Sequence, residues 1–258
     1  MLYILLSAVA GASLLMAALF LVQRRTGDAG IVDVGWSYGV GLMSLWLAWA
    51  LPGDLLHRLL MALIAVPWSL RLGTYLLMDR VMGSEEDGRY AALRKRWGDA
   101  AQRNFFLFFQ VQAGFIVLFA IPLFGAGMQS QAPAIWDYLA LVTGWGALFG
   151  ESLADSQLRR WRAHPGNRGK TCRTGLWRYS RHPNYFFEWL HWWAYALLCA
   201  GSWWFLAALA GPVLMLLFLY RVTGIPHTEG QALRSRGGDY RAYQKETSAF
   251  FPWFPRLR

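Results

Sequence analysis

Residues 2–22 read LYILLSAVAGASLLMAALFLV and contain no charged side chain. A transmembrane helix needs about 20 consecutive, predominantly apolar residues to cross the hydrocarbon core of a bilayer. Of the 258 residues, 56% are hydrophobic and 16% are charged, whereas soluble chains carry roughly 25% charged residues. The sequence therefore predicts an integral membrane protein. The high hydrophobic content excludes a disordered or collagenous class. A disulfide framework is excluded because the only cysteines are Cys172 and Cys199.

Further apolar stretches of similar length follow along the chain, and together they predict an all-α helical bundle with about seven transmembrane helices. The last two stretches are separated only by residues 200–202, which predict a tight hairpin; the alternative is one long re-entrant unit. The predicted spans are 2–22, 35–52, 56–78, 105–126, 135–158, 185–201 and 203–221.

The basic residues indicate the orientation of the spans. All of the 25 Lys and Arg residues except Arg58 and Arg71 lie in the segments 23–34, 79–104, 159–184 and 221–258. Cytoplasmic loops carry such an excess of positive charge. We therefore expect the N-terminus outside and the C-terminus in the cytoplasm. The net charge of +10 then reflects membrane topology, and we expect no nucleic-acid partner.

Charged side chains inside a membrane cost about 3 kcal/mol or more unless they face a cavity or a partner. Glu151, Asp155, Arg159 and Arg162 recur at spacings of four, four and three, which places them on one face of the fifth predicted helix. One interpretation is an internal salt-bridge ladder in which both acids pair with Arg159. The other is the polar wall of a buried site.

The third predicted span carries Trp68, Arg71 and Tyr75 on one face. A buried arginine needs an anion, and Asp33, at the start of the second span, is a candidate. The alternative for Asp33 is an ordinary helix N-cap.

A basic loop leads into the sixth span through GLWRYSRHPNYFFE (175–188). Pro183 fits the first position of a helix, so free backbone N–H groups there would attract anions. The alternative to an anion site is ordinary flanking positive charge, which contacts anionic lipid headgroups. Residues that would surround a bound phosphate-bearing cofactor are Lys170, Arg178, Arg181 and His182, followed within the helix by Asn184, Tyr185 and Glu188.

The C-terminal segment is expected to be cytoplasmic. Thr228 and Gln231 predict a capping box for a short helix with Glu229 in its first turn, and Gly237-Gly238 predicts its break. Tyr240 lies on one side of a second amphipathic piece. Arg221, at the inner end of the last span, either reaches the lipid headgroups or joins the same pocket. No zinc-ligand spacing is present, so we expect no metal.

The segment GLWRYSRHPNY (175–185) closely resembles the signature of the membrane steroid 5α-reductase-like superfamily, which also includes sterol reductases and isoprenylcysteine carboxyl methyltransferases. The motifs DxxW (33–36), WxxRL (68–72), EDxRY (86–90) and ExxxDxQ (151–157) resemble a bacterial branch of that superfamily, and the likeness spans nearly the whole chain. It implies one integral-membrane domain over 1–258 in a bacterial inner membrane, with helices of 1–130 on the substrate side and a cofactor-binding region in 135–258.

In the reductases of this superfamily the cofactor is NADPH, and several of its contacts come from residues matching Asp155, Arg162, Asn184, Glu188 and Arg221. The resemblance thus implies an NADPH-dependent reductase with a lipophilic substrate that enters from the bilayer. The Gln-Glu pair and the tyrosine that activate the ketone in steroid 5α-reductases have no clear match. We therefore expect the reaction type of these reductases, but not a steroid itself as the substrate.

As a hypothesis, hydride passes to a carbon–carbon double bond conjugated to a carbonyl, and the charge that develops on oxygen needs a donor. Tyr75 is the candidate donor, tuned by Arg71 and Asp33, since a nearby arginine favours the phenolate. The substrate pocket is assigned to Trp36, Trp68 and Glu151. The cofactor is assigned to Asp155, Arg159, Arg162, Lys170, Arg178, Arg181, His182, Asn184, Tyr185, Glu188, Arg221, Glu229 and Tyr240.

Two alternatives come from other classes. An S-adenosylmethionine-dependent methyltransferase uses a similar Arg-His-Pro-x-Tyr element with a later Arg and Glu, here Arg221 and Glu229. A wide basic cluster fits it less well, because several arginines suit a cofactor with three phosphates. A non-enzymatic lipid-binding protein explains the basic loops but not the carboxylate of Glu188 within a membrane helix.

Overall fold

The computed structural model describes residues 1–82, 86–222 and 224–256, and helix is the only regular structure among them. The all-α prediction is confirmed. The helices are α1 (Leu2–Thr26), α2 (Ile31–Ala50), α3 (Leu55–Leu76), α4 (Gly88–Trp97), α5 (Ala101–Gly127), α6 (Ile135–Ala163), α7 (Pro183–Leu198), α8 (Trp204–Ala208), α9 (Ala210–Leu217) and α10 (Ile225–Glu246).

Five of the described helical stretches are long and apolar enough to cross a membrane: Leu2–Thr26, Ile31–Ala50, Leu55–Asp79, Gly88–Gly127 and Trp204–Glu246. The predicted fifth and sixth spans form the helices α6 and α7, which are not among these five stretches. Helix α7 has 16 residues, about 24 Å at 1.5 Å per residue, and α6 carries Asp137, Glu151 and Asp155. The count of seven and the orientation stay predictions.

The hairpin predicted at 200–202 is present as a turn between α7 and α8. The carbonyl of Cys199 accepts hydrogen bonds from the backbone N–H of Ser202 (3.1 Å) and from its hydroxyl (3.0 Å). Gly201 adopts φ +83°, a left-handed conformation that favours glycine. The predicted span 203–221 is divided at Leu209, since Pro212 lacks the N–H that would bond Ala208 in a continuous helix.

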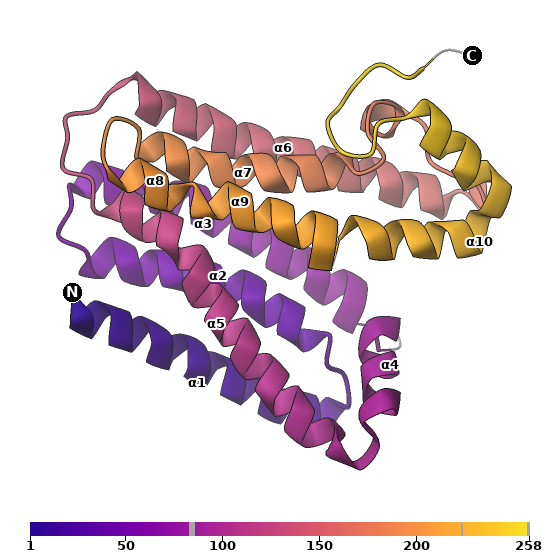
Figure 1. Cartoon of the computed structure of the whole chain (residues 1–258), viewed down its shortest axis with the longest axis horizontal. Helices are drawn as coiled ribbons and strands as arrows, with labels where there is room; N and C mark the ends of the chain where they lie inside the picture. Colours follow the sequence, from indigo (N-terminus) through magenta and orange to yellow (C-terminus); the bar gives the residue numbers. More distant parts are fainter. Residues whose placement is uncertain (83–85, 223, 257–258) are drawn as a thin grey trace. The chain divides into compact units, whose positions relative to one another are not determined.

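The chain divides into two compact units, Met1–Asp137 with Leu198–Ala208, and Tyr138–Leu197 with Leu209–Arg258. In the first unit, α1, α2, α3 and α5 pack together and α4 precedes α5 (Figure 1). Helices α2 and α3 pack most extensively, because small side chains let them approach. Ser69 donates to the Ser37 carbonyl at 2.8 Å, and the ring of Tyr38 lies against Gly73.

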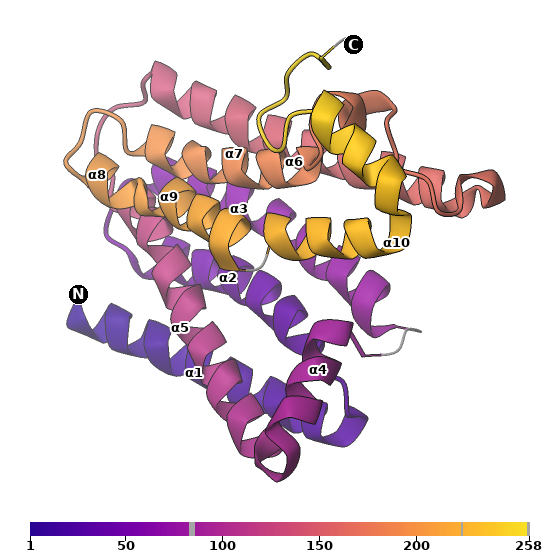
Figure 2. The same ribbon diagram turned by 45° about the vertical axis from the view of Figure 1, so that its right-hand side comes forward.

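The second unit is built on α6, α7, α9 and α10 (Figure 2). Gly150 of α6 lies against the ring of Phe187 of α7, and the indole N–H of Trp177 donates to the carbonyl of Ala154 at 2.9 Å. Gly237 breaks α10 at φ 50° and ψ −116°, as the sequence predicted, so the two halves of α10 turn toward each other. The C-terminal segment then pairs with the basic loop: Arg181 N–H donates to the Ser248 carbonyl at 2.8 Å.

Candidate functional site

In the first unit, Asp33 belongs to a hydrogen-bond network that was not predicted from the sequence. Helix α2 has Gly30 as its N-cap and Asp33 in its first turn, so the N-cap interpretation of Asp33 is wrong. Its carboxylate accepts hydrogen bonds from Arg89 (2.9 Å) and from the hydroxyl of Tyr90 (2.8 Å). Arg89 also pairs with Asp87, the N-cap of α4, at 3.0 Å. The start of α4 therefore lies against the start of α2.

A second ion pair fastens the same junction. Arg94 of α4 binds Glu86 at 2.6 Å and the Gly27 carbonyl at 2.6 Å. Glu86 in turn accepts the backbone N–H of Ala29 at 3.0 Å. Arg89 and Tyr90 were missed as site residues, although the EDxRY run at 86–90 carried the signal. These contacts hold Asp33 in a fixed position at one end of the unit.

The predicted donor Tyr75 lies beside Arg71, whose guanidinium stands over the tyrosine ring at 5.4 Å from its centroid. Both residues lie on α3, one turn apart. Trp68, one turn earlier, is fully buried and meets the ring of Trp36 edge-on at 6.0 Å. Asp33 and Trp36 lie on α2 and the others on α3, so the predicted catalytic and substrate-side residues of this unit occupy two directly packed helices.

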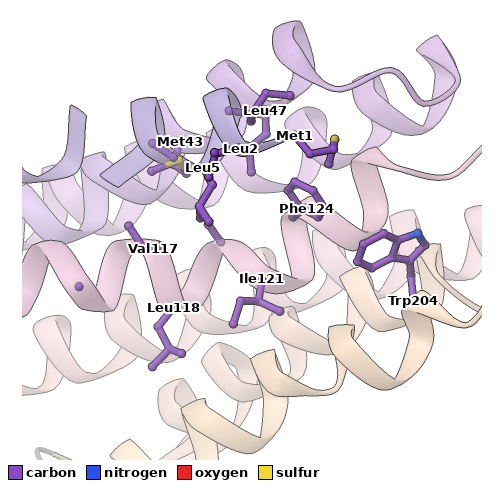
Figure 3. Close-up of a pocket in the computed structure, with 14 residues that line it drawn as sticks. Met1, Leu2, Leu5, Met43, Leu47, Val117, Leu118, Ile121, Phe124 and Trp204 are labelled. Atoms are coloured by element: carbon purple, nitrogen blue, oxygen red, sulfur yellow. The ribbon is translucent and has the colours of Figure 1, made fainter. Parts of the chain in front are cut away.

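An apolar pocket of about 670 Å³ lies in the same unit (Figure 3). It is lined by residues of α1, α2 and α5 and by Trp204, and every lining residue is apolar. Met43 and Leu47 of α2 lie 10 and 14 residues beyond Asp33, about 15–21 Å along the helix. A pocket of this size and lining accepts a hydrocarbon chain or ring.

In the second unit, Glu229 binds both Arg181 and His182, and these three residues are called the Arg-His corner. Its carboxylate accepts Nε of Arg181 at 2.7 Å, Nε2 of His182 at 3.3 Å and the amide of Gln244 at 2.8 Å. Arg181 also donates to the carbonyls of Gln244 (2.9 Å) and Thr247 (2.8 Å). With 12% of its side chain exposed, Arg181 is an internal anchor for α10.

Burial and charge set the protonation states of this corner. Burial alone would raise the pKa of Glu229, but hydrogen bonds from His182 and Arg181 and the charge of Arg181 lower it to about 2. Burial lowers the pKa of His182, and the hydrogen bond with Glu229 offsets this only in part. Near pH 7 the corner therefore consists of a carboxylate, a guanidinium and a neutral imidazole.

The polar residues around the start of α7 connect to α6 and α10. The amide of Asn184 donates to Asp155 of α6 at 3.0 Å, and the indole of Trp192 donates to Glu188 at 3.3 Å. The hydroxyls of Tyr185 and Thr228 lie 3.1 Å apart. The capping box predicted from Thr228 is wrong, because α10 begins at Ile225 after the N-cap Gly224 and has Pro226 in its first turn. Pro183 begins α7, as predicted.

The remaining predicted cofactor residues, and Glu151 of the predicted substrate pocket, differ in their exposure. Tyr240 is buried and packs on Tyr243, with 5.8 Å between ring centroids. Glu151 is buried on α6. The sequence from 156 to 187 contains eight Lys and Arg residues and no acid. Exposed basic side chains are those of Arg159, Arg162, Lys170, Arg178 and Arg221.

These residues fit a phosphate-bearing cofactor. Exposed arginines supply fork-shaped donors for phosphate, and the Asn184–Asp155 pair supplies an amide and a buried carboxylate beside them. No group of three or more His, Cys, Asp or Glu side chains suited to a metal ion occurs within residues 1–82, 86–222 and 224–256.

A family model described as "Protein of unknown function (DUF1295)" matches residues 19–247 of the chain. No curated protein and no solved structure matches it.

Proposed function

The chain belongs to the DUF1295 family, which is steroid 5α-reductase-like, and from this premise we propose that it is an NADPH-dependent membrane reductase. The reaction is reduction of a carbon–carbon double bond conjugated to a carbonyl in a lipid-like or steroid-like substrate. The proposed location is the bacterial inner membrane, with the second unit's basic loop on the cytoplasmic side.

The observation that carries the proposal is the hydrogen bond between Asn184 and Asp155 at the start of α7. Asp155 shares one face of α6 with Arg159 and Arg162, since the three are spaced by four and three residues. A polar amide–carboxylate pair therefore adjoins exposed guanidinium groups on a single helix face. This pairing suits a ligand with an amide-bearing ring at one end and phosphates at the other.

In the proposal, Arg159, Arg162, Lys170 and Arg178 bind the phosphates. Arg181 is a positioning residue, because its donors hold Glu229 and two carbonyls. Asn184 and Glu188 orient the carboxamide of the nicotinamide ring. When bound, NADPH supplies the hydride.

Tyr75 is the proposed hydrogen-bond donor to the substrate carbonyl. Negative charge develops on that oxygen during reduction, and a donor fixed in advance stabilises it. The guanidinium of Arg71 lies over the tyrosine ring and adds a fixed positive charge that stabilises the developing negative charge. Trp68, fully buried one turn before Arg71 on α3, keeps water from that side of the site.

The apolar pocket of the first unit supports the assignment of a lipophilic substrate. Its lining residues offer no polar side chain, so it recognises shape and hydrophobicity rather than a head group. We assign it to the apolar part of the substrate, taken from the bilayer.

A thermal-shift titration of the detergent-purified protein with NADPH, NADH and S-adenosylmethionine tests the cofactor. A ligand that binds only the folded state stabilises it by about 2.7 kcal/mol at 100 times its Kd. We expect stabilisation by NADPH, weakened in Arg162→Gln and retained in Arg103→Gln, a matched variant at an exposed arginine of α5. Stabilisation by S-adenosylmethionine alone would replace the proposal with a methyltransferase, and no stabilisation by any of the three would overturn it.

A further inference from the structure

A second pocket of about 340 Å³, lined by five polar residues and a tryptophan, lies at the C-terminal end of α6 and the loop that follows it. All of its lining residues belong to the second unit. None of them is acidic, and none was assigned to the proposed cofactor. They are Gln157, Arg160, Trp161, His164, Asn167 and Thr174.

This pocket and the proposed cofactor site use opposite faces of α6. An α-helix turns by about 100° per residue, so residues 151, 155, 159 and 162 point within one narrow sector. Residues 157, 160 and 161 point into the opposite sector. The pocket is therefore a separate site and does not rest on the proposed reductase activity.

The pocket's polar side chains present hydrogen-bond donors. Arg160 is held by two hydrogen bonds to the hydroxyl of Ser156, at 2.7 and 3.2 Å, so its guanidinium is oriented while it keeps its charge. Nδ1 of His164 accepts the N–H of Gly166 at 3.2 Å, which places the ring proton on Nε2 as a donor. Gln157 uses its carbonyl oxygen to accept the N–H of Leu176 at 2.9 Å, which leaves the amide N–H groups as its donors.

Trp161 of the pocket carries a buried polar atom. Its indole nitrogen is buried and has no hydrogen-bond partner among the residues that the structure describes. An indole N–H can only donate, and a buried donor without an acceptor costs about 1–3 kcal/mol. Trp161 also lines the pocket, so an anion bound there lies next to the side chain that carries this donor.

We propose that this pocket binds a phosphate group. A guanidinium, an imidazole and an indole line it, and none of its lining residues carries a carboxylate. The volume suits a phosphate ester with a small attached group. The phosphate comes either from an anionic lipid headgroup at the membrane surface or from a soluble phosphate ester.

Three probes separate these sources in the full-length, detergent-purified protein. Dioctanoyl phosphatidic acid carries both phosphate and acyl chains, sn-glycerol 3-phosphate carries only the phosphate, and dioctanoylglycerol carries only the chains. Each is titrated at constant ionic strength, and the Kd is taken from the rise in melting temperature. We expect dioctanoylglycerol to change the melting temperature of the unchanged protein and of the pocket variants by the same amount. Stabilisation by both phosphates indicates a soluble ester, and stabilisation by phosphatidic acid alone indicates a lipid headgroup.

The variants test whether the phosphate occupies this pocket. Arg160→Gln should raise the Kd about tenfold or more, because a charge-assisted hydrogen bond is lost. Arg168→Gln removes the same charge from an exposed residue of the same loop that does not line the pocket, and should change the Kd less than about twofold. Trp161→Phe removes the indole N–H but keeps an aromatic ring, and should also weaken binding.

Other results overturn the proposal. Equal weakening in Arg160→Gln and Arg168→Gln means a diffuse charge effect, and no stabilisation by either phosphate means no site. Competition between the phosphate probe and NADPH, together with loss of NADPH affinity in Arg160→Gln, means that the pocket belongs to the cofactor site instead. Failure of NADPH to bind at all leaves the phosphate result standing, since the two sites lie on opposite faces of α6.

Discussion

Glu229→Gln is the sharpest perturbation of the Arg-His corner, because one carboxylate joins three segments. It accepts hydrogen bonds from Arg181 and His182, which precede α7, and from Gln244 in the second half of α10. Gln244 reaches Glu229 only because Gly237 bends the helix between them. A glutamine at 229 keeps one acceptor oxygen, but its NH₂ group then faces another donor.

The magnitude follows from the bonds that are lost. A hydrogen bond to a charged group contributes about 1.5–3 kcal/mol. Glu229 has 16% of its side chain exposed, so solvent screens part of this, and we expect about 2 kcal/mol of local destabilisation. That amount corresponds to about a 30-fold change in the opening equilibrium.

Hydrogen-exchange mass spectrometry at neutral pH measures that opening. The reporters are the amides of Arg181, bonded to Ser248 at 2.8 Å, and of Thr247, bonded to Tyr243 at 3.0 Å. We expect exchange about 30-fold faster in Glu229→Gln.

Glu246→Gln is the matched control, since it makes the same chemical change on the same helix. Glu246 pairs with Arg173 at 3.0 Å, and both side chains are 35% exposed. An exposed pair contributes about 0–1 kcal/mol, which predicts an acceleration of less than about fivefold. Equal acceleration in the two variants would refute the central role given to Glu229.

Further predictions concern His182, the packing of α2 on α3, and Tyr75. Burial lowers the pKa of His182 below its ordinary 6.5, so the open form binds the proton more readily. Protection of this corner should therefore fall as the pH drops below about 6.5, and a His182→Gln variant should lose that dependence. Gly73→Ala places a methyl group 2.6 Å from the ring of Tyr38 and should lower the thermal stability by about 1–3 kcal/mol. Gly11→Ala, whose added methyl group meets nothing within 4 Å, should be neutral or stabilising by up to about 1 kcal/mol in the same melting experiment. Tyr75→Phe should slow reduction of an enone substrate at least tenfold while leaving the Kd for NADPH within about twofold, and a large loss of NADPH binding would contradict the donor role.

Local sequence determined the helices and several of their ends. The apolar run at 2–22 lies within α1, Pro183 begins α7, and Gly237 breaks α10. These features depend on hydrophobicity, on a ring that fixes φ, and on a residue free to adopt positive φ. They depend on residues that are neighbours along the chain, so they can be read directly from the sequence.

The hydrogen-bond partners of the polar residues could not be predicted from local sequence. Asp33 binds Arg89, 56 residues away, and Glu229 binds Arg181, 48 residues away. Thr228 contacts the hydroxyl of Tyr185 rather than capping its own helix. The energy of a cap and the energy of a long-range hydrogen bond are similar in size, so local pattern alone does not choose between them.

By itself the sequence determined the class of protein, the apolar helices and the presence of a polar stripe on α6, because hydrophobicity and helical periodicity are properties of consecutive residues. Only the tertiary structure decided which charges neutralise one another. It commits Arg181 and Arg173 to acids of α10, leaves Arg162 and Arg178 exposed, and places Arg160 in a pocket with Trp161. The physical reason is that an ion pair requires two groups within about 4 Å, and that proximity is set by how the helices pack.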